Sequence, residues 1–176
     1  MYIGLIGTNG AGKTAVSDYY KTKGFTVFSL SDIVRQEATR LGRSLIRDNL
    51  VKTGNELKAE FGDDVLAIRV FDQAAMYDNV VFDSVRHPAE VRYLKAHGVR
   101  MIGLDAPIGL RYERIHLRQS ETDAIDFETF RLHDQRERSG ESSGQKVDEC
   151  LGLCEHVFQN DGLLETVLEK IDRAIA

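Results

Sequence analysis

The feature that most constrains the fold is a glycine-rich loop near the start of the chain, at residues 7–14 (Gly-Thr-Asn-Gly-Ala-Gly-Lys-Thr). The loop matches the pattern Gly-x-x-x-x-Gly-Lys-Ser/Thr at every fixed position. Residues 2–6 form a short apolar run typical of a buried strand, and residues 14–23 predict a helix. In this order the three elements place backbone N–H groups and a helix N-terminus around a phosphate. We therefore predict a nucleotide-phosphate site rather than an accidental glycine turn.

Each residue type in this loop has a physical role. Glycine tolerates positive φ and lets phosphate oxygens approach the backbone closely. Lys13 supplies positive charge near the β- and γ-phosphates, and the Thr14 hydroxyl is a candidate Mg²⁺ ligand. The expected cofactors are ATP and Mg²⁺, and the expected nucleotide-binding residues of the loop are Thr8, Asn9, Gly10, Ala11, Gly12, Lys13 and Thr14.

Length and composition favour one soluble domain spanning residues 1–176. The net charge of −5 does not indicate a general nucleic-acid or anionic-membrane surface. Because we find neither a membrane-length apolar run nor a signal-peptide pattern, we expect a cytoplasmic protein without a membrane partner. Cys150 and Cys154 are too few for a disulfide framework or a zinc site, so we expect core or half-buried thiols on a helix. The sequence gives no indication of oligomeric state.

Short apolar strands alternate with helices along the rest of the chain. Further strands are expected at residues 25–29, 80–82, 99–104 and about 157–158, and helices at 33–41, 47–61, 65–77, 88–97, 108–118, about 127–138 and 163–175. Ser31 or Asp32 is the expected N-cap of the helix at 33–41. This alternation predicts an α/β fold with a parallel five-stranded sheet between two helical layers. Ligands of such sheets bind at the carboxyl ends of the strands, where residues 7–14, 29–32, 83–86 and 160–162 lie.

Charged residues gather at these strand ends. Asp83 follows an apolar strand, the position of an acidic Mg²⁺ ligand, although an isolated Asp there is often a cap or turn residue. Arginines are the second signal: Arg35, Arg86, then Arg111, Arg114 and Arg118 on one face of a helix, then Arg131, Arg136 and Arg138. Solvated surface arginines are the alternative for each of them. Phosphoryl transfer, however, needs positive charge around the moving group, which favours a role for several.

Three segments resemble the adenylate-kinase-like nucleoside monophosphate kinases. Residues 29–35 are similar to that family's Ser-x-x-Asp-x-x-Arg segment, residues 83–86 to its Asp-Gly-x-x-Arg segment, and residues 114–118 to the Arg-x-x-x-Arg that opens its lid. Ser84 replaces the family's glycine, the proline before the arginine is absent, and the lid carries no cysteine cluster. Residues 83–91 and 156–162 look closer to deoxynucleotide kinase-like domains and to dephospho-coenzyme A kinase.

The resemblance implies a P-loop NTPase fold with an acceptor-binding helical segment at about 31–78 and a lid at about 114–140. Residues 119–126 would form the lid tip and Asn55 and Glu56 are possible base readers, although a polar helix face explains these two equally well. The segment at residues 156–162 resembles a nucleobase-contacting loop, which implies that Asn160 and Gly162 contact adenine; a simple turn is the alternative. The implied acceptor-binding residues are Asp32, Arg35 and Arg86, the Mg²⁺ ligands Thr14 and Asp83, and the catalytic residues Lys13, Arg114, Arg118 and, from the helix at 131–138, Arg136.

We therefore expect ATP-dependent phosphoryl transfer to a nucleoside or deoxynucleoside monophosphate, with a small nucleotide as the binding partner. Two alternatives remain. One is transfer to a ribose hydroxyl, as in dephospho-coenzyme A kinase. The other is a nucleotide-binding regulatory module without catalytic activity.

Overall fold

The computed structural model describes residues 1–117, 125–140 and 145–175. The strands in these parts are β1 (Tyr2–Gly7), β2 (Thr26–Ser29), β3 (Val80–Val85), β4 (Arg100–Asp105) and β5 (His156–Gln159). The helices are α1 (Lys13–Thr22), α2 (Leu30–Arg40), α3 (Arg47–Phe61), α4 (Val65–Ala74), α5 (Pro88–Ala96), α6 (Ile108–Leu117), α7 (Phe127–Ser139), α8 (Val147–Gly152) and α9 (Leu164–Ile175). The alternation of strands and helices follows the sequence pattern.

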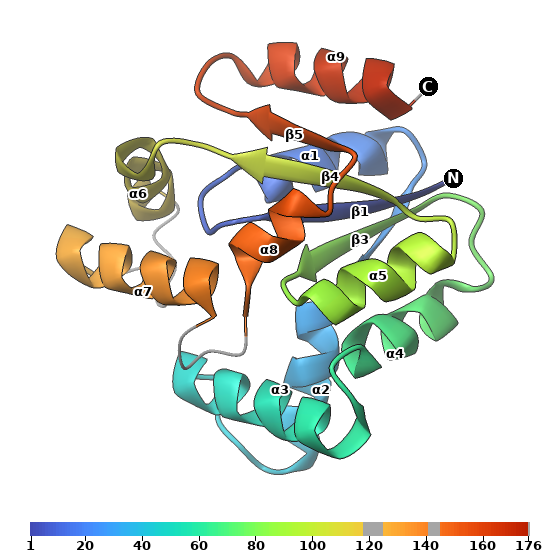
Figure 1. Ribbon diagram of the computed structural model, residues 1–176, viewed down its shortest axis with the longest axis vertical. Helices are drawn as coiled ribbons and strands as arrows, with labels where there is room; N and C mark the ends of the chain where they lie inside the picture. Colours follow the sequence, from blue (N-terminus) through green and yellow to red (C-terminus); the bar gives the residue numbers. More distant parts are fainter. Residues whose placement is uncertain (118–124, 141–144, 176) are drawn as a thin grey trace.

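The sheet has five strands in the order β2-β3-β1-β4-β5, and every neighbouring pair is parallel. Because all strands run in one direction, their carboxyl ends meet at a single edge of the sheet. In Figure 1 the arrowheads point towards α6 and α7, which lie beyond this edge. The predicted phosphate loop, the end of β3 and the segment after β5 are therefore brought to the same side of the molecule.

Helices cover both faces of the sheet. On one face α1 and α9 enclose a core that includes Leu5, Tyr20 and Ile171. On the other face α2, α4, α5 and α8 pack over a second core that includes Phe82 and Met101. Figure 1 shows α5 and α8 on the near side of the sheet and α1 behind it. This is the three-layer P-loop NTPase kinase fold, as predicted.

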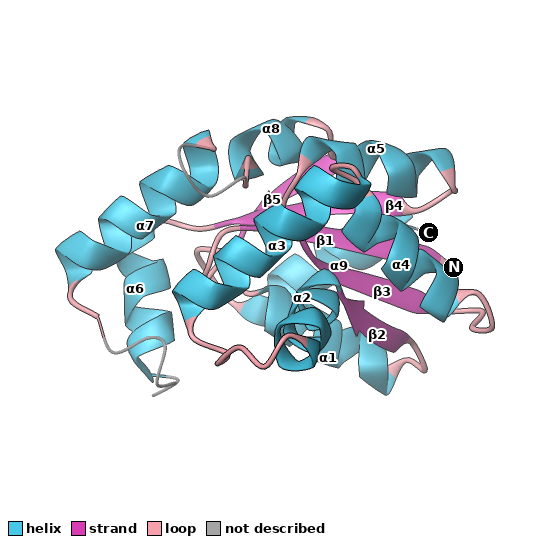
Figure 2. Cartoon of the chain, turned by 90° about the horizontal axis from the view of Figure 1, so that it is seen from below, coloured by secondary structure: helices cyan, strands magenta, loops and turns pink. Residues whose placement is uncertain are grey.

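The helical segment expected at residues 31–78 lies to one side of the sheet. α3 packs on α2 and α4 and buries only Thr53 and Leu57, which explains why its sequence is so polar. Figure 2 shows α7 beyond the sheet on the side of α3, with α6 next to it. Most of the expected lid tip at residues 119–126 lies outside the described residues.

Some expected boundaries were wrong. β3 continues through Val85 rather than closing at Asp83, because its pairing with β1 resumes at Val85 after an irregularity in register. α2 begins at Leu30 with Ser29 as its N-cap, so Ser31 and Asp32 lie in its first turn and do not cap it. Of the two cysteines, Cys150 is buried and Cys154 half-buried, as expected, but only Cys150 lies on a helix, because α8 ends at Gly152. Within the described parts of the chain, no helix is long and apolar enough to cross a membrane.

Candidate functional site

The phosphate loop has a backbone that only glycine accommodates at two positions. Gly10 has φ +80° and Gly12 has φ +105°, both in the left-handed region. A Cβ on Gly10 would lie 2.5 Å from the carbonyl oxygen of Arg111, and a Cβ on Gly12 would lie 2.2 Å from Nδ2 of Asn160. The loop therefore folds against two other segments, and these segments fix its shape.

Asn160 braces the loop from behind. Its side chain is 3% exposed. Nδ2 donates to the carbonyl of Ala11 at 2.9 Å, and the backbone N–H donates to the carbonyl of Asp105 at 2.8 Å. Asn160 thus joins the end of β5 to β4 and to the loop. A contact with a nucleobase, expected for Asn160 and the exposed Gly162, stays a prediction.

The two residues that follow the last loop glycine differ in exposure and contacts. The Lys13 ammonium donates to the carbonyls of Gly7 at 2.7 Å and Thr8 at 2.9 Å, so the side chain lies back along the loop. Thr14 is exposed in the first turn of α1. An ammonium group held at the loop and an accessible hydroxyl next to it form a setting suited to phosphate and Mg²⁺.

The loop opens into a cavity of about 560 Å³ at the carboxyl edge of the sheet. Most residues that we expected at the site from sequence meet there, although they come from separate segments. The lining includes Asn9, Gly10, Gly12, Lys13, Thr14, Arg35, Asp83, Arg86 and Arg114. One cavity therefore presents loop glycines, an ammonium group, a carboxylate and several guanidinium groups together.

Ser84, which follows Asp83 within β3, stands where the nucleoside monophosphate kinases that this segment resembles have glycine. Ser84 has φ +64°, the left-handed conformation that glycine adopts without strain. Its N–H donates to the Asp83 carboxylate at 2.6 Å, and its hydroxyl accepts a bond from Ser29 at 3.1 Å. Ser84 therefore has a conformation that glycine would adopt more easily, and it adds a hydroxyl to the cavity.

On the acceptor side, Arg35 and Arg86 differ in their surroundings. Arg35 is largely exposed and donates to Ser31 at 2.6 Å and to Asp32 at 3.0 Å. Arg86 is half-buried and donates to Oε1 of Gln145 at 3.0 Å. Burial, followed by the nearby Arg47, lowers the pKa of Arg86 from its ordinary value. A guanidinium that has lost water and faces other cations gains from a bound anion.

The arginines of α6 are not equivalent, which corrects the expectation that they share one site-facing surface. Arg111 is 2% exposed and forms a bidentate pair with Asp134 at 2.5 and 2.9 Å. Its Nε donates to Ala106 at 2.8 Å. Arg114 instead lies at the loop, 3.5 Å from the Gly10 carbonyl. Arg118 lies outside the described residues.

The arginines of α7 also separate into different roles. Arg131 pairs with the exposed Glu128 on its own helix at 3.0 Å. Arg138 pairs with both carboxylate oxygens of Asp105 at 2.7 and 2.9 Å, which strongly raises its pKa despite the opposing effect of burial. Arg136 lines a cavity between α3 and α7, whereas Arg114 lines the loop cavity.

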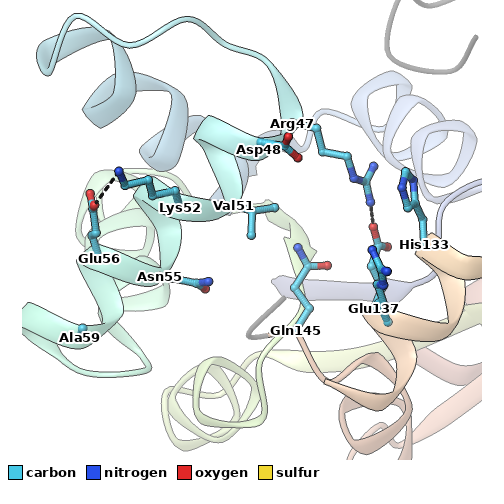
Figure 3. Close-up of a pocket in the computed structure, with 11 residues that line it drawn as sticks. Arg47, Asp48, Val51, Lys52, Asn55, Glu56, Ala59, His133, Glu137 and Gln145 are labelled. Atoms are coloured by element: carbon cyan, nitrogen blue, oxygen red, sulfur yellow. Dashed lines mark hydrogen bonds and ion pairs between the residues drawn. The ribbon is translucent and has the colours of Figure 1, made fainter. Parts of the chain in front are cut away.

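Two further cavities extend from the site towards α3. One, of about 380 Å³, shares Asn9, Ser31, Arg35, Ser84 and Arg86 with the loop cavity. The other, of about 630 Å³, lies between α3 and α7 and is lined by Asn55 and Glu56 among others. Figure 3 shows Asn55 on the α3 wall of this cavity, and Gln145 and Glu137 on the opposite side. Space for a molecule larger than phosphate thus adjoins the loop.

Residues at the site that were not predicted from sequence include Arg47, Glu137 and Gln145, which line its cavities, and Asp105, which contacts Thr8 of the loop. Asp105 ends the apolar strand β4. Asp83 was selected because an acidic residue after an apolar strand lies at the carboxyl edge of the sheet, and the same argument applies to Asp105. The positions of Arg47, Glu137 and Gln145 depend on how α3, α7 and the segment before α8 meet in space, and we find no local sequence signal for that.

Comparison with known proteins places this geometry in a family. The sequence matches the family described as AAA domain over residues 3–141. The chain belongs to this family. A UPF0200/UPF0201 protein of Archaeoglobus fulgidus is 32% identical over 176 residues, which cover 96% of the chain but 53% of that relative. A UPF0200 protein of Methanocaldococcus jannaschii is 26% identical, with 99% of the chain and 89% of the relative covered. The chain thus spans about half the length of the first of these relatives.

Solved structures support the fold assignment. The shikimate kinase of Bacteroides thetaiotaomicron superposes with a TM-score of 0.63 at 13% identity, covering 99% of this chain and 98% of that one. The shikimate kinase of Aquifex aeolicus gives a TM-score of 0.58 at 17% identity, covering 99% and 96%. At these identities the likeness concerns the fold alone. The finer resemblance to nucleoside monophosphate kinases stays a prediction.

Proposed function

We propose that this member of the AAA domain family transfers the γ-phosphate of ATP to a small acceptor, a nucleoside or deoxynucleoside monophosphate. The observation that carries the proposal is the composition of the loop cavity. Lys13, Asp83 and Arg86 line it together although they come from distant parts of the sequence. A site that only bound nucleotide would not require an acceptor-side arginine next to the loop.

The residues present fit ATP and Mg²⁺. The loop is shaped so closely that a Cβ at Gly10 would meet backbone, as expected of a cradle for phosphate oxygens. The Thr14 hydroxyl and the Asp83 carboxylate line the same cavity and are oxygen ligands of the kind that Mg²⁺ prefers. Mg²⁺, when bound, neutralises charge on the β- and γ-phosphates.

The chain's own residues then position the reactants. Lys13 exchanges its contacts with two loop carbonyls for the nucleotide phosphates, and Arg114 approaches the same phosphates from α6. Arg35 and Arg86 hold the acceptor phosphate on the opposite side of the cavity. A phosphate acceptor needs no general base, so Asp32 serves to orient Arg35. Arg118 and Arg136 remain candidate lid contacts with the donor.

A coupled assay with ATP tests the proposal on a panel of ribo- and deoxynucleoside monophosphates and dephospho-coenzyme A. We expect turnover of at least one monophosphate. Turnover of dephospho-coenzyme A alone would refute the monophosphate acceptor, and ATP binding without turnover of any acceptor would identify a regulatory module. Lys13→Ala should abolish transfer while the chain still folds, and Lys21→Ala, an exposed lysine of α1, is the matched control.

Loss of the acceptor arginine should have a different kinetic signature. Arg86→Ala removes a charge-assisted contact and should raise the acceptor KM about 10- to 100-fold with little change in ATP affinity. Arg92→Ala, an exposed arginine of α5, is the control. A fall in ATP affinity alone would contradict the assignment of Arg86 to the acceptor.

A further inference from the structure

Glu137, on the inner side of α7, occupies an unusual position for a carboxylate. Its side chain is 6% exposed, although it lies at the junction of cavities that open to solvent. One oxygen pairs with the Arg47 guanidinium, and the other lies 3.8 Å from the guanidinium of Arg86. Figure 3 shows Glu137 reaching from α7 towards Arg47 at the end of α3. The carboxylate therefore lies between two arginines from separate elements.

The charge around this carboxylate favours an anion at the same position. Two guanidinium groups face one carboxylate, and the pKa of Arg86 is lowered by burial and by Arg47. Gln145 adds a neutral partner to Arg86 at 3.0 Å. A dianionic phosphate carries more charge than the Glu137 carboxylate and has oxygens for both cations, because guanidinium groups match phosphate oxygens in geometry and charge.

The fold allows Glu137 to move without moving its helix. One turn earlier, Asp134 is held by Arg111 through two hydrogen bonds of 2.5 and 2.9 Å in a buried setting. α7 is thus anchored independently of Glu137. Release of both arginines therefore calls for a change of the Glu137 rotamer rather than a movement of α7.

We propose that Arg47 and Arg86 form a phosphate-binding subsite for which the Glu137 carboxylate is a built-in competitor. Arg86 also lines the loop cavity, whereas Arg47 lines the cavities next to α3, so the subsite extends the reaction site towards α3. The subsite rests on the proposed function for its biological ligand, the phosphate of the acceptor. Its existence as an anion site does not require transfer to occur.

Titration calorimetry with inorganic phosphate tests the subsite directly. Glu137→Gln keeps the shape of the side chain and removes its charge, so phosphate should bind at least about tenfold more tightly, which corresponds to about 1.4 kcal/mol. Glu128→Gln, on the same helix but exposed, should leave phosphate affinity unchanged. Combining Glu137→Gln with Arg47→Ala should remove the gain. The affinity for acetate, a monoanion, should rise less in Glu137→Gln than the affinity for phosphate.

Two results would overturn the subsite: unchanged or weaker phosphate binding in Glu137→Gln, or a gain that survives Arg47→Ala. If Glu137→Gln fails to fold, Glu137→Asp withdraws the carboxylate by one methylene and should give a smaller gain in phosphate affinity. Unchanged phosphate affinity in Glu137→Asp would then also refute the subsite. The transfer assay is separate. A chain that binds phosphate in this way but turns over no acceptor would refute the proposed function and leave the subsite intact.

Discussion

The buried pair of Arg111 and Asp134 gives a sharp test of what holds α7 in place. The two side chains are 2% and 6% exposed and share two hydrogen bonds. Removing one partner of a buried pair costs about 3–5 kcal/mol because the other charge is left uncompensated. Arg111 would keep Ala106 at 2.8 Å, and Asp134 would keep Arg138 at 3.2 Å. We therefore expect the lower end of that range, about 3 kcal/mol, for Arg111→Met and for Asp134→Leu.

A double-mutant cycle isolates the interaction itself. The double variant replaces the pair with apolar side chains and leaves no charge uncompensated, so it should cost at most about 3 kcal/mol rather than the sum of the single losses, and the coupling energy should be at least about 3 kcal/mol. Urea unfolding followed by circular dichroism measures each free energy of unfolding. The exposed pair of Glu128 and Arg131 on α7 is the control, with an expected coupling of at most about 0.5 kcal/mol. Additive losses at Arg111 and Asp134 would refute the reasoning.

Two smaller perturbations test local features. His87 accepts a bond from the Ala89 N–H at Nδ1, and burial lowers its pKa below the ordinary 6.5. The unfolded chain then binds the proton more readily than the folded chain, so the contribution of His87 to stability is fully present above about pH 6.5 and is lost as the pH falls below it. His87→Asn should flatten this loss in thermal melts from pH 8 to 5, and an unchanged slope would exclude His87 as its source. Ser84→Gly relieves backbone strain of about 1 kcal/mol but raises the entropy of the unfolded chain by a similar free energy, so the free energy of unfolding should change little. Ser84→Val should lower the free energy of unfolding by more than about 1 kcal/mol. Equal stabilities for the two variants would contradict the strain at Ser84.

Local patterns predicted much of the fold because they depend on near neighbours in sequence. The polar helix at residues 47–61 has the predicted bounds, since Gly62 ends it with positive φ. The strand at 80–82 was predicted too short, because pairing with β1 carries β3 beyond its apolar part. Apolar runs reveal which segments are buried, but not where tertiary pairing stops.

The site residues also fall into those that a local motif predicts and those whose partners are distant in sequence. The motif residues Lys13, Asp83 and Arg86 line the loop cavity because parallel strands bring their carboxyl ends together. Arg111 and Arg114 lie three residues apart on α6, but Arg111 is buried against Asp134. The spacing of arginines on one helix does not reveal a partner 23 residues away. Arg47 and Glu137, 90 residues apart, could not be paired from sequence for the same reason.

The brace of the loop by Asn160 sets an order of events during synthesis. Ala11 and Asn160 are 149 positions apart, so the loop leaves the ribosome long before the side chain that supports it. The pairing of β5 with β4 places Asn160 against Asp105 and Ala11. The phosphate loop is therefore made well before the residue that braces it, and the brace can form only once residue 160 has been added.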